Sequence, residues 1–192
     1  MRGAAKIVDV KELQRLFAHV STRRQSDRDT LLLLLSYKAG MRACELAGLD
    51  WSMVTSPSGK IADSIVIAGH IAKNGRARRI PMHPELARAL RANWKARGRP
   101  TTGPVLRSQK GGHLASGSVV NWFTALYNQV GLTGCSSHSG RRTFITNSAR
   151  LVAKVGGCLR DVQELAGHSS LTTTERYIEG DRAAQRKLVC LL

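Results

Sequence analysis

The chain has 192 residues, and 42% of them are hydrophobic, which is enough for one domain, or for one domain with a small appendage. Its 30 Lys and Arg residues against 13 Asp and Glu residues give a net charge of +17 at pH 7. The composition excludes a collagen-like or disordered chain, and the charge favours a polyanionic partner, nucleic acid first and an anionic membrane second. A solvated basic surface is the plain alternative.

Cysteine spacing and the start of the chain favour a reducing compartment. None of the cysteines forms a Cys-x-x-Cys pair, so we expect four free thiols: Cys44, Cys135, Cys158 and Cys190. Residues 1–6 lack the apolar segment of a signal peptide, and the apolar run Leu31–Leu35 is too short to span a bilayer. We therefore expect a soluble, cytoplasmic protein.

Three helices are predicted in the first quarter of the chain. Apolar residues at helical spacing in Val8–Phe17 predict the first, with Asp9 as its cap. A second helix starts at Asp27, carries the leucine run and ends near Gly40. A short helix over Ala43–Leu46 follows.

The segment from residue 52 to 79 predicts a small antiparallel sheet of two or three strands. Ser56–Gly59 is typical of a turn, and β-branched residues follow at Ile61 and Ile65–Ile67. Asn74-Gly75 favours a hairpin, with Lys73 at its turn and Arg78–Pro81 on the returning strand.

The rest of the chain is predicted to be helical, beginning with Pro84, which suits a first helical turn. The expected helices are Pro84–Arg97, Ser116–Val130, Ser139–Val152, Arg160–Leu165, Thr172–Ile178 and Asp181–Leu191. The fold class is therefore α+β, mainly helical, and the sequence contains no internal repeat.

Two segments carry groups that suit chemistry on a phosphate. In the first, His138 and Arg141 are three residues apart, which places them on one face of a helical turn. In the second, Gly167 ends a helix and leaves His168 at its C-terminal end. A threonine-rich cap then precedes a helix that bears Tyr177.

This constellation resembles the catalytic domain of the tyrosine recombinase (phage integrase) family, from about residue 8 to the end of the chain. The family's hallmark is an Arg, a β-hairpin Lys, a His-x-x-Arg pair, a His or Trp, and a Tyr nucleophile, in that order. The matching residues are Arg42, Lys73, His138, Arg141, His168 and Tyr177. Glu45 matches a residue that supports the active site in such proteins. The resemblance implies a helical catalytic domain with a small antiparallel sheet.

The resemblance also implies a mechanism. Arg42 and Arg141 would clamp the non-bridging phosphate oxygens, and His168 would hydrogen-bond the same phosphate. A tyrosine hydroxyl has a pKa of about 10, so Tyr177 would need the arginines and His138 for activation. Lys73 would protonate the leaving 5′ oxygen. The covalent phosphotyrosine keeps the bond energy, so we expect no ATP, metal or cofactor.

Each residue taken alone has a structural alternative, and the set in order carries the prediction. His138 alone suits a cap or a core position, Tyr177 alone suits packing, and His168 alone suits a helix C-terminus. Lys73 competes with other cations nearby in the sequence. The remaining arginines are expected to contact the DNA backbone or to lie on the surface: Arg76, Arg78, Arg79 and Arg142.

The sequence departs from the family pattern in two places. Gly140 stands where the family usually has a leucine, so we expect a loosened helix around Arg141. Relatives also carry an N-terminal DNA-gripping domain, whereas residues 1–192 correspond to the catalytic domain alone. The chain is then a naturally short recombinase or a fragment. Its amphipathic tail, Arg182–Leu192, is expected to dock on a neighbouring subunit of a DNA-bound tetramer or to pack on its own subunit.

Three other functions compete with recombination. One is a DNA-binding accessory or regulatory protein without catalysis, which the intact residue set disfavours. Another is a type IB topoisomerase-like enzyme, which the Gly-His-Ser-Ser context and the small size disfavour. The third is a metal-dependent nuclease, which lacks its carboxylate cluster here.

Overall fold

The computed structural model describes residues 5–73, 75–178, 186, 189 and 190. The α-helices are α1 Val10–Ser21, α2 Ser26–Lys38, α3 Ala43–Gly48, α4 Pro84–Ala96, α5 Ser116–Val130, α6 Ser139–Leu151, α7 Leu159–Ala166 and α8 Leu171–Glu175. Short 3-10 helices η1 and η2 cover Trp51–Met53 and Val152–Val155, and the strands are β1 Ser64–Ile67 and β2 Arg78–Pro81. The predicted class, mainly helical with a small antiparallel sheet, is confirmed.

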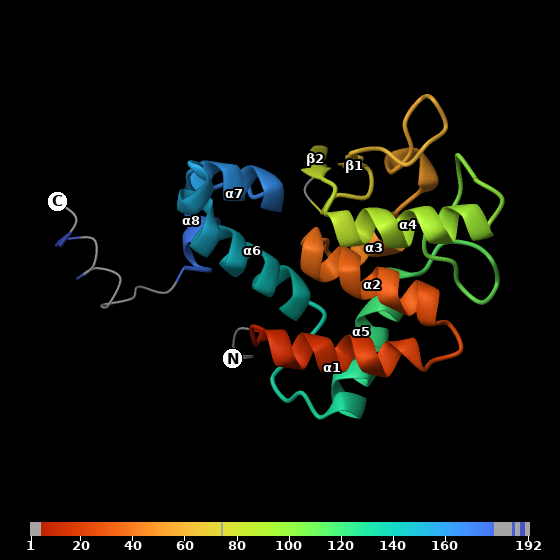
Figure 1. Cartoon of the computed structure of the whole chain (residues 1–192), viewed down its shortest axis with the longest axis horizontal. Helices are drawn as coiled ribbons and strands as arrows, with labels where there is room; N and C mark the ends of the chain where they lie inside the picture. Colours follow the sequence, from red (N-terminus) through yellow and green to blue (C-terminus); the bar gives the residue numbers. More distant parts are fainter. Residues whose placement is uncertain (1–4, 74, 179–185, 187–188, 191–192) are drawn as a thin grey trace.

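The core lies around α2, whose leucine run is buried on all sides because α1, α4 and α6 pack against the helix (Figure 1). The helix has little amphipathic character, as expected of one that is covered all round. The largest fully buried side chains elsewhere in this core include Trp51, Phe123 and Tyr127. The predicted cap of α1 is confirmed, since Asp9 and Glu12 form a reciprocal capping box.

The sheet has two antiparallel strands, in a register that pairs Ser64 with Pro81 and Ile67 with Arg78. The returning strand is the predicted one, but β1 ends at Ile67 and β2 begins only at Arg78, so the strands are not joined by the tight two-residue hairpin that was expected. After β1, the amides of Ile71 and Ala72 both bond the carbonyl of Ala68. Local turn bonds therefore replace the ladder well before the Asn-Gly pair.

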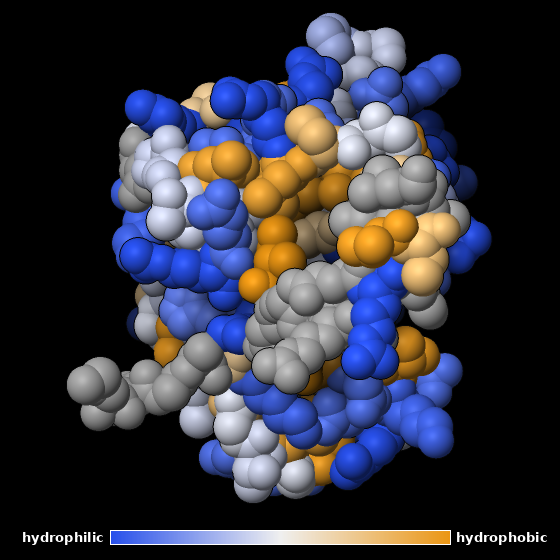
Figure 2. Space-filling model, turned by 90° about the vertical axis from the view of Figure 1, so that its left-hand side faces the viewer, coloured by the Kyte–Doolittle hydropathy of each residue, from blue (hydrophilic) through white to orange (hydrophobic). Residues whose placement is uncertain are grey.

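The C-terminal helices α7 and α8 lie at one end of the molecule and are joined through α6 to the helices around α2 (Figure 1). Ile145, Val162 and Ala166 form a second small apolar cluster there. Figure 2 shows this side of the molecule, where hydrophilic residues surround patches of hydrophobic surface. None of the described helices is long and apolar enough to cross a membrane.

Two glycines bring α6 close to the core, and they correct the expectation that Gly140 loosens this helix. Gly140 is buried, and a β-carbon there would collide with the Ser36 side chain of α2. At Gly40, whose φ is +60°, a β-carbon would collide with the ring of Phe144. The missing side chain at residue 140 therefore tightens the α2–α6 contact.

Other differences from the sequence predictions lie at element ends. Helix α8 ends at Glu175, so Tyr177 lies in the following turn and not on the helix. The residue before α8 is Ser170, whose side chain caps no amide, so the expected threonine-rich cap is wrong. The helix expected over residues 181–191 and the tail Arg182–Leu192 lie outside the described residues, except for residues 186, 189 and 190.

Replacing Gly140 with Ala is expected to destabilise the protein by about 1–3 kcal/mol, because the added methyl group overpacks the α2–α6 contact. The matched control is Gly117→Ala in α5, where a β-carbon meets no atom within 4 Å. That variant should be neutral or stabilised by up to about 1 kcal/mol. Urea unfolding checks both, and equal effects of the two substitutions would contradict the tight contact.

Candidate active site

Arg141 is the most buried cation of the predicted set, with 4% of its surface exposed. Its guanidinium donates to the carbonyl of Gly40 at 2.7 Å and to the carbonyl of Ala166 at 2.6 Å, and lies 3.0 Å from Nε2 of His168. Burial, and after it the charge of Arg42, lowers the pKa of Arg141 to about 10, so the group stays charged at neutral pH. These bonds fix the guanidinium where α2, α6 and α7 meet.

Arg42 stands directly before α3 and is held by Glu45. Its backbone amide donates to one carboxylate oxygen of Glu45 at 2.8 Å, and its guanidinium donates to the other at 3.1 Å. Glu45 is completely buried. Burial alone would raise the pKa of this carboxyl, but bonds and charge from Arg78 and Arg42 hold that pKa below its usual value. The carboxylate is therefore ionised at neutral pH and orients Arg42.

His168 follows Gly167, whose left-handed conformation (φ +64°) ends α7 as predicted. Nδ1 of His168 lies 3.0 Å from the hydroxyl of Thr174, and its Nε2 faces a guanidinium that can only donate. The neutral ring therefore carries its proton on Nδ1. Burial, followed by the charges of Arg141, Arg42 and Arg78, lowers the pKa of His168 to about 4.

Tyr177 lies beside these groups within the same chain. Its ring stacks on the His168 ring, with centroids 5.5 Å apart and planes 23° apart. The guanidinium carbon of Arg142 is 6.0 Å from the Tyr177 ring centroid. Tyr177, Arg141, Arg142 and His138 line one hollow of about 830 Å³. A phenol, an imidazole and a buried guanidinium thus share one accessible space.

His138 directly precedes α6 and lines that hollow. Burial, and after it the charges of Lys73, Arg141 and Arg42, lowers the pKa of His138. The ring is therefore neutral at neutral pH and able to accept a proton. Lys73 is exposed on the connection between the strands, and its charge is one of those that lower the pKa of His138.

The arginines expected at DNA occupy different environments. Arg76 and Arg79 are exposed and line a second hollow of about 450 Å³, together with His168 and Arg160. Arg78 lines the same hollow but is mostly buried: only 7% of its side chain is exposed, and it binds both oxygens of Glu45 at 2.6 and 2.8 Å. These bonds link Arg78 to the residue that holds Arg42.

Sequence reasoning missed Thr174 and the buried place of Arg78. The buried position of Arg78 could have been predicted from the alternation of side chains along β2, since a strand that buries Ile80 turns Arg78 to the same side and Arg79 to the other. Thr174 has no exposed surface, but in the sequence nothing distinguishes it from the two threonines that precede it. Its signal is its position three residues before Tyr177, on the turn that faces His168.

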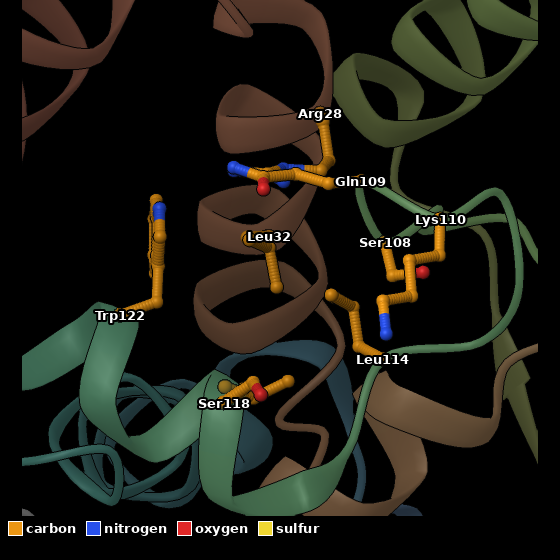
Figure 3. Close-up of a pocket in the computed structure, with 9 residues that line it drawn as sticks. Arg28, Leu32, Ser108, Gln109, Lys110, Leu114, Ser118 and Trp122 are labelled. Atoms are coloured by element: carbon orange, nitrogen blue, oxygen red, sulfur yellow. The ribbon is translucent and has the colours of Figure 1, made fainter.

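Other features lie outside this constellation. A hollow of about 400 Å³ between α2 and α5 is lined by Arg28, Leu32, Lys110 and Trp122, and by none of the predicted site residues (Figure 3). The four cysteines are free, as predicted. Among the described residues, no three His, Cys, Asp or Glu side chains lie together as a metal-binding set would require.

Comparison with known proteins identifies relatives of this chain. A model described as "Phage integrase family" matches residues 6–183. Tyrosine recombinase XerD of Mycobacterium tuberculosis (strain H37Rv) is 30% identical over 189 residues, which cover 92% of this chain and 57% of XerD. Tyrosine recombinase XerC of Brucella suis is 32% identical over 154 residues, covering 78% of this chain and 45% of XerC. The chain thus spans about half the length of the curated relatives it matches.

A solved structure with the same fold is the XerH site-specific recombinase bound to difH substrate in a pre-cleavage complex. Its TM-score is 0.70 at 22% identity, and the match covers 95% of this chain and 53% of XerH. At this identity the likeness establishes the fold, which agrees with the architecture expected from the sequence.

The His168 imidazole is expected to titrate near pH 4, because burial and three guanidiniums disfavour its charged form. An unfolded His titrates at about 6.5, so this residue contributes stability that is present above that pH and lost as the pH falls toward 4. NMR titration of the ring checks this, and Arg42→Ala should raise the midpoint by removing one charge. A midpoint at the ordinary value in the folded protein would contradict the derived environment.

Proposed function

Because the chain belongs to the phage integrase family, we propose that it is the catalytic domain of a tyrosine-type site-specific DNA recombinase that cuts and rejoins DNA through Tyr177. The observation that carries the proposal is that Tyr177 shares one hollow with Arg141 and His138, and that its ring stacks on His168, which contacts Arg141. A nucleophile and the groups that stabilise a pentacoordinate phosphorus then act within one subunit.

The proposed reaction begins when Arg42 and Arg141 bind the non-bridging oxygens of the scissile phosphate. The Tyr177 oxygen forms a bond to phosphorus, and the bond from phosphorus to the 5′ oxygen breaks. The products are a 3′-phosphotyrosine and a free 5′-hydroxyl. Attack by a 5′-hydroxyl of a partner strand reverses these bonds and releases Tyr177, so that strands are exchanged and rejoined without an external energy source.

Two residues move the protons in this scheme. His138, neutral because burial and nearby cations lower its pKa, accepts the Tyr177 proton. The negative phosphate offsets the surrounding positive charge and favours that transfer. Lys73, exposed on the connection between β1 and β2, donates a proton to the departing 5′ oxygen. The negative charge of the phosphate also favours protonation of His168 at Nε2, from which the ring donates a hydrogen bond to the phosphate. The cationic side chains fill the role that a metal ion has in other phosphoryl-transfer enzymes.

The proposal includes the setting of the reaction. The partner is double-stranded DNA, which suits the net charge of +17, and the exposed Arg76 and Arg79 beside the site contact its backbone together with Arg142. The active assembly is a homotetramer on DNA in the cytoplasm. In it the tail Arg182–Leu192 docks on a neighbouring subunit.

The test incubates the native protein with a pool of randomised DNA duplexes, each nicked just downstream of the randomised region. We expect a covalent protein–DNA adduct on a denaturing gel. A nick at this place lets the short 5′-hydroxyl fragment diffuse away, which traps the intermediate. Tyr177→Phe should abolish the adduct and leave DNA binding unchanged, because only the attacking oxygen is lost. Tyr127→Phe, which alters a buried hydroxyl outside the site, is the control and should retain the adduct.

Failure of the native chain to form an adduct with DNA that it binds would favour an accessory protein without catalysis. An adduct that persists in Tyr177→Phe would refute the assigned nucleophile. Relaxation of supercoiled plasmid without strand exchange would favour the topoisomerase-like alternative, and loss of cleavage in EDTA would favour the nuclease.

A further inference from the structure

Arg78 joins three elements that carry the residues of the proposed reaction. From β2 it reaches α3, where both terminal nitrogens bind the two oxygens of Glu45. Its Nε donates to the carbonyl of Leu165 in the last turn of α7 at 3.2 Å. Its stem lies against Gly167, where a β-carbon would meet Cδ of Arg78 at 2.7 Å. The Arg78 side chain therefore contacts both Glu45, which holds Arg42, and Gly167, which precedes His168.

The end of α7 is held by two guanidiniums. Arg78 binds the carbonyl of Leu165, and Arg141 binds that of Ala166 at 2.6 Å. These carbonyls lack helical partners, and cations are favoured at a helix C-terminus. Because His168 follows two residues after Ala166, fixing these carbonyls fixes the place from which its ring reaches Arg141 and Tyr177.

We propose that Arg78 is a positioning residue of the phosphate site, which sets Arg42 through Glu45 and His168 through the end of α7. The inference rests on the proposed function and extends it to a residue that touches neither the phosphate nor Tyr177. Arg78 is also the first residue of β2, the strand that follows the connection carrying Lys73. Its bonds to Glu45 and Leu165 therefore tie β2 to α3 and α7. The contribution is to the geometry of the phosphate-binding groups and not to DNA affinity.

Lysine cannot replace Arg78 in this role. A guanidinium forms two parallel bonds to the carboxylate and still presents Nε to a carbonyl, whereas an ammonium is a single point of charge. Arg78→Lys therefore keeps the charge beside Glu45, so the buried carboxylate stays paired, but loses the simultaneous hold on Leu165. The substitution separates geometry from charge.

A matched control is the same substitution at Arg91, which is exposed on α4 and lines neither hollow of the site. Arg91→Lys should leave the cleavage rate at saturating DNA unchanged. Arg79, next to Arg78 in the chain, is exposed on the opposite side of β2, where its guanidinium donates to Ser64 at 3.0 Å. If Arg79 contacts the DNA backbone, Arg79→Ala should lower both the affinity for DNA and its salt dependence.

Single-turnover cleavage of a nicked duplex recovered from the adduct pool tests the inference. At saturating DNA, Arg78→Lys should cleave about ten- to a hundredfold more slowly, the size expected when reacting groups are slightly misplaced, with unchanged DNA affinity. A 5′-bridging sulfur, whose thiolate leaves without a proton, should rescue Lys73→Ala but not Arg78→Lys. A native cleavage rate, a loss confined to affinity, or rescue by sulfur would overturn the inference.

A readout without DNA keeps the inference separate from the proposed function. In Arg78→Lys, the ring ¹⁵N signals of His168 should shift, because a displaced α7 end alters the contacts of Nε2 with Arg141 and of Nδ1 with Thr174. Arg91→Lys should leave these signals unchanged. Native His168 signals in folded Arg78→Lys would overturn the inference, whereas the absence of any adduct from the native chain would refute the proposed function alone.

Discussion

The site depends on one buried negative charge in a chain whose net charge is +17. The Glu45 carboxylate, completely buried, accepts bonds from both Arg42 and Arg78. Without it, these guanidiniums would face each other and Arg141 across a poorly solvated space, where like charges repel strongly. With it, two of the three cations are oriented before any phosphate is present. Preorganisation of this kind lets positive groups stabilise developing negative charge without rearranging during the reaction.

A second constraint follows from helix α7. Its last carbonyls have no helical partners and would be costly to bury unsatisfied. Arg141 and Arg78 bind them, and Gly167 then turns the chain so that His168 lies against Arg141 and Tyr177. The same two arginines therefore satisfy the helix end and place the imidazole. Thr174 completes the arrangement by accepting from Nδ1, which leaves Nε2 facing the guanidinium. Fold stability and site geometry here rest on shared hydrogen bonds.

The sequence predicted the class of the fold, most helix positions and the proximity of His138, Arg141, His168 and Tyr177, because periodicity, caps and motif spacing are local signals. It did not predict contacts between residues that are far apart in the sequence. Gly140 looked like a weakness in α6, whereas Ser36 of another helix makes the missing side chain necessary. Arg78 looked like surface charge because its partner, Glu45, is 33 residues away in the chain. The Asn74-Gly75 pair suggested a tight turn, but bonds to the carbonyl of Ala68 ended the strand earlier.

The claim that Tyr177 forms the covalent bond is tested most directly by locating that bond. The trapped adduct can be digested with nuclease and trypsin and the modified peptide sequenced by mass spectrometry, since cleavage after Arg176 places Tyr177 at the start of peptide 177–182. The expected result is a nucleotide joined through its 3′-phosphate to Tyr177. A nucleotide on any other residue, or a link through a 5′-phosphate, would contradict the proposed chemistry.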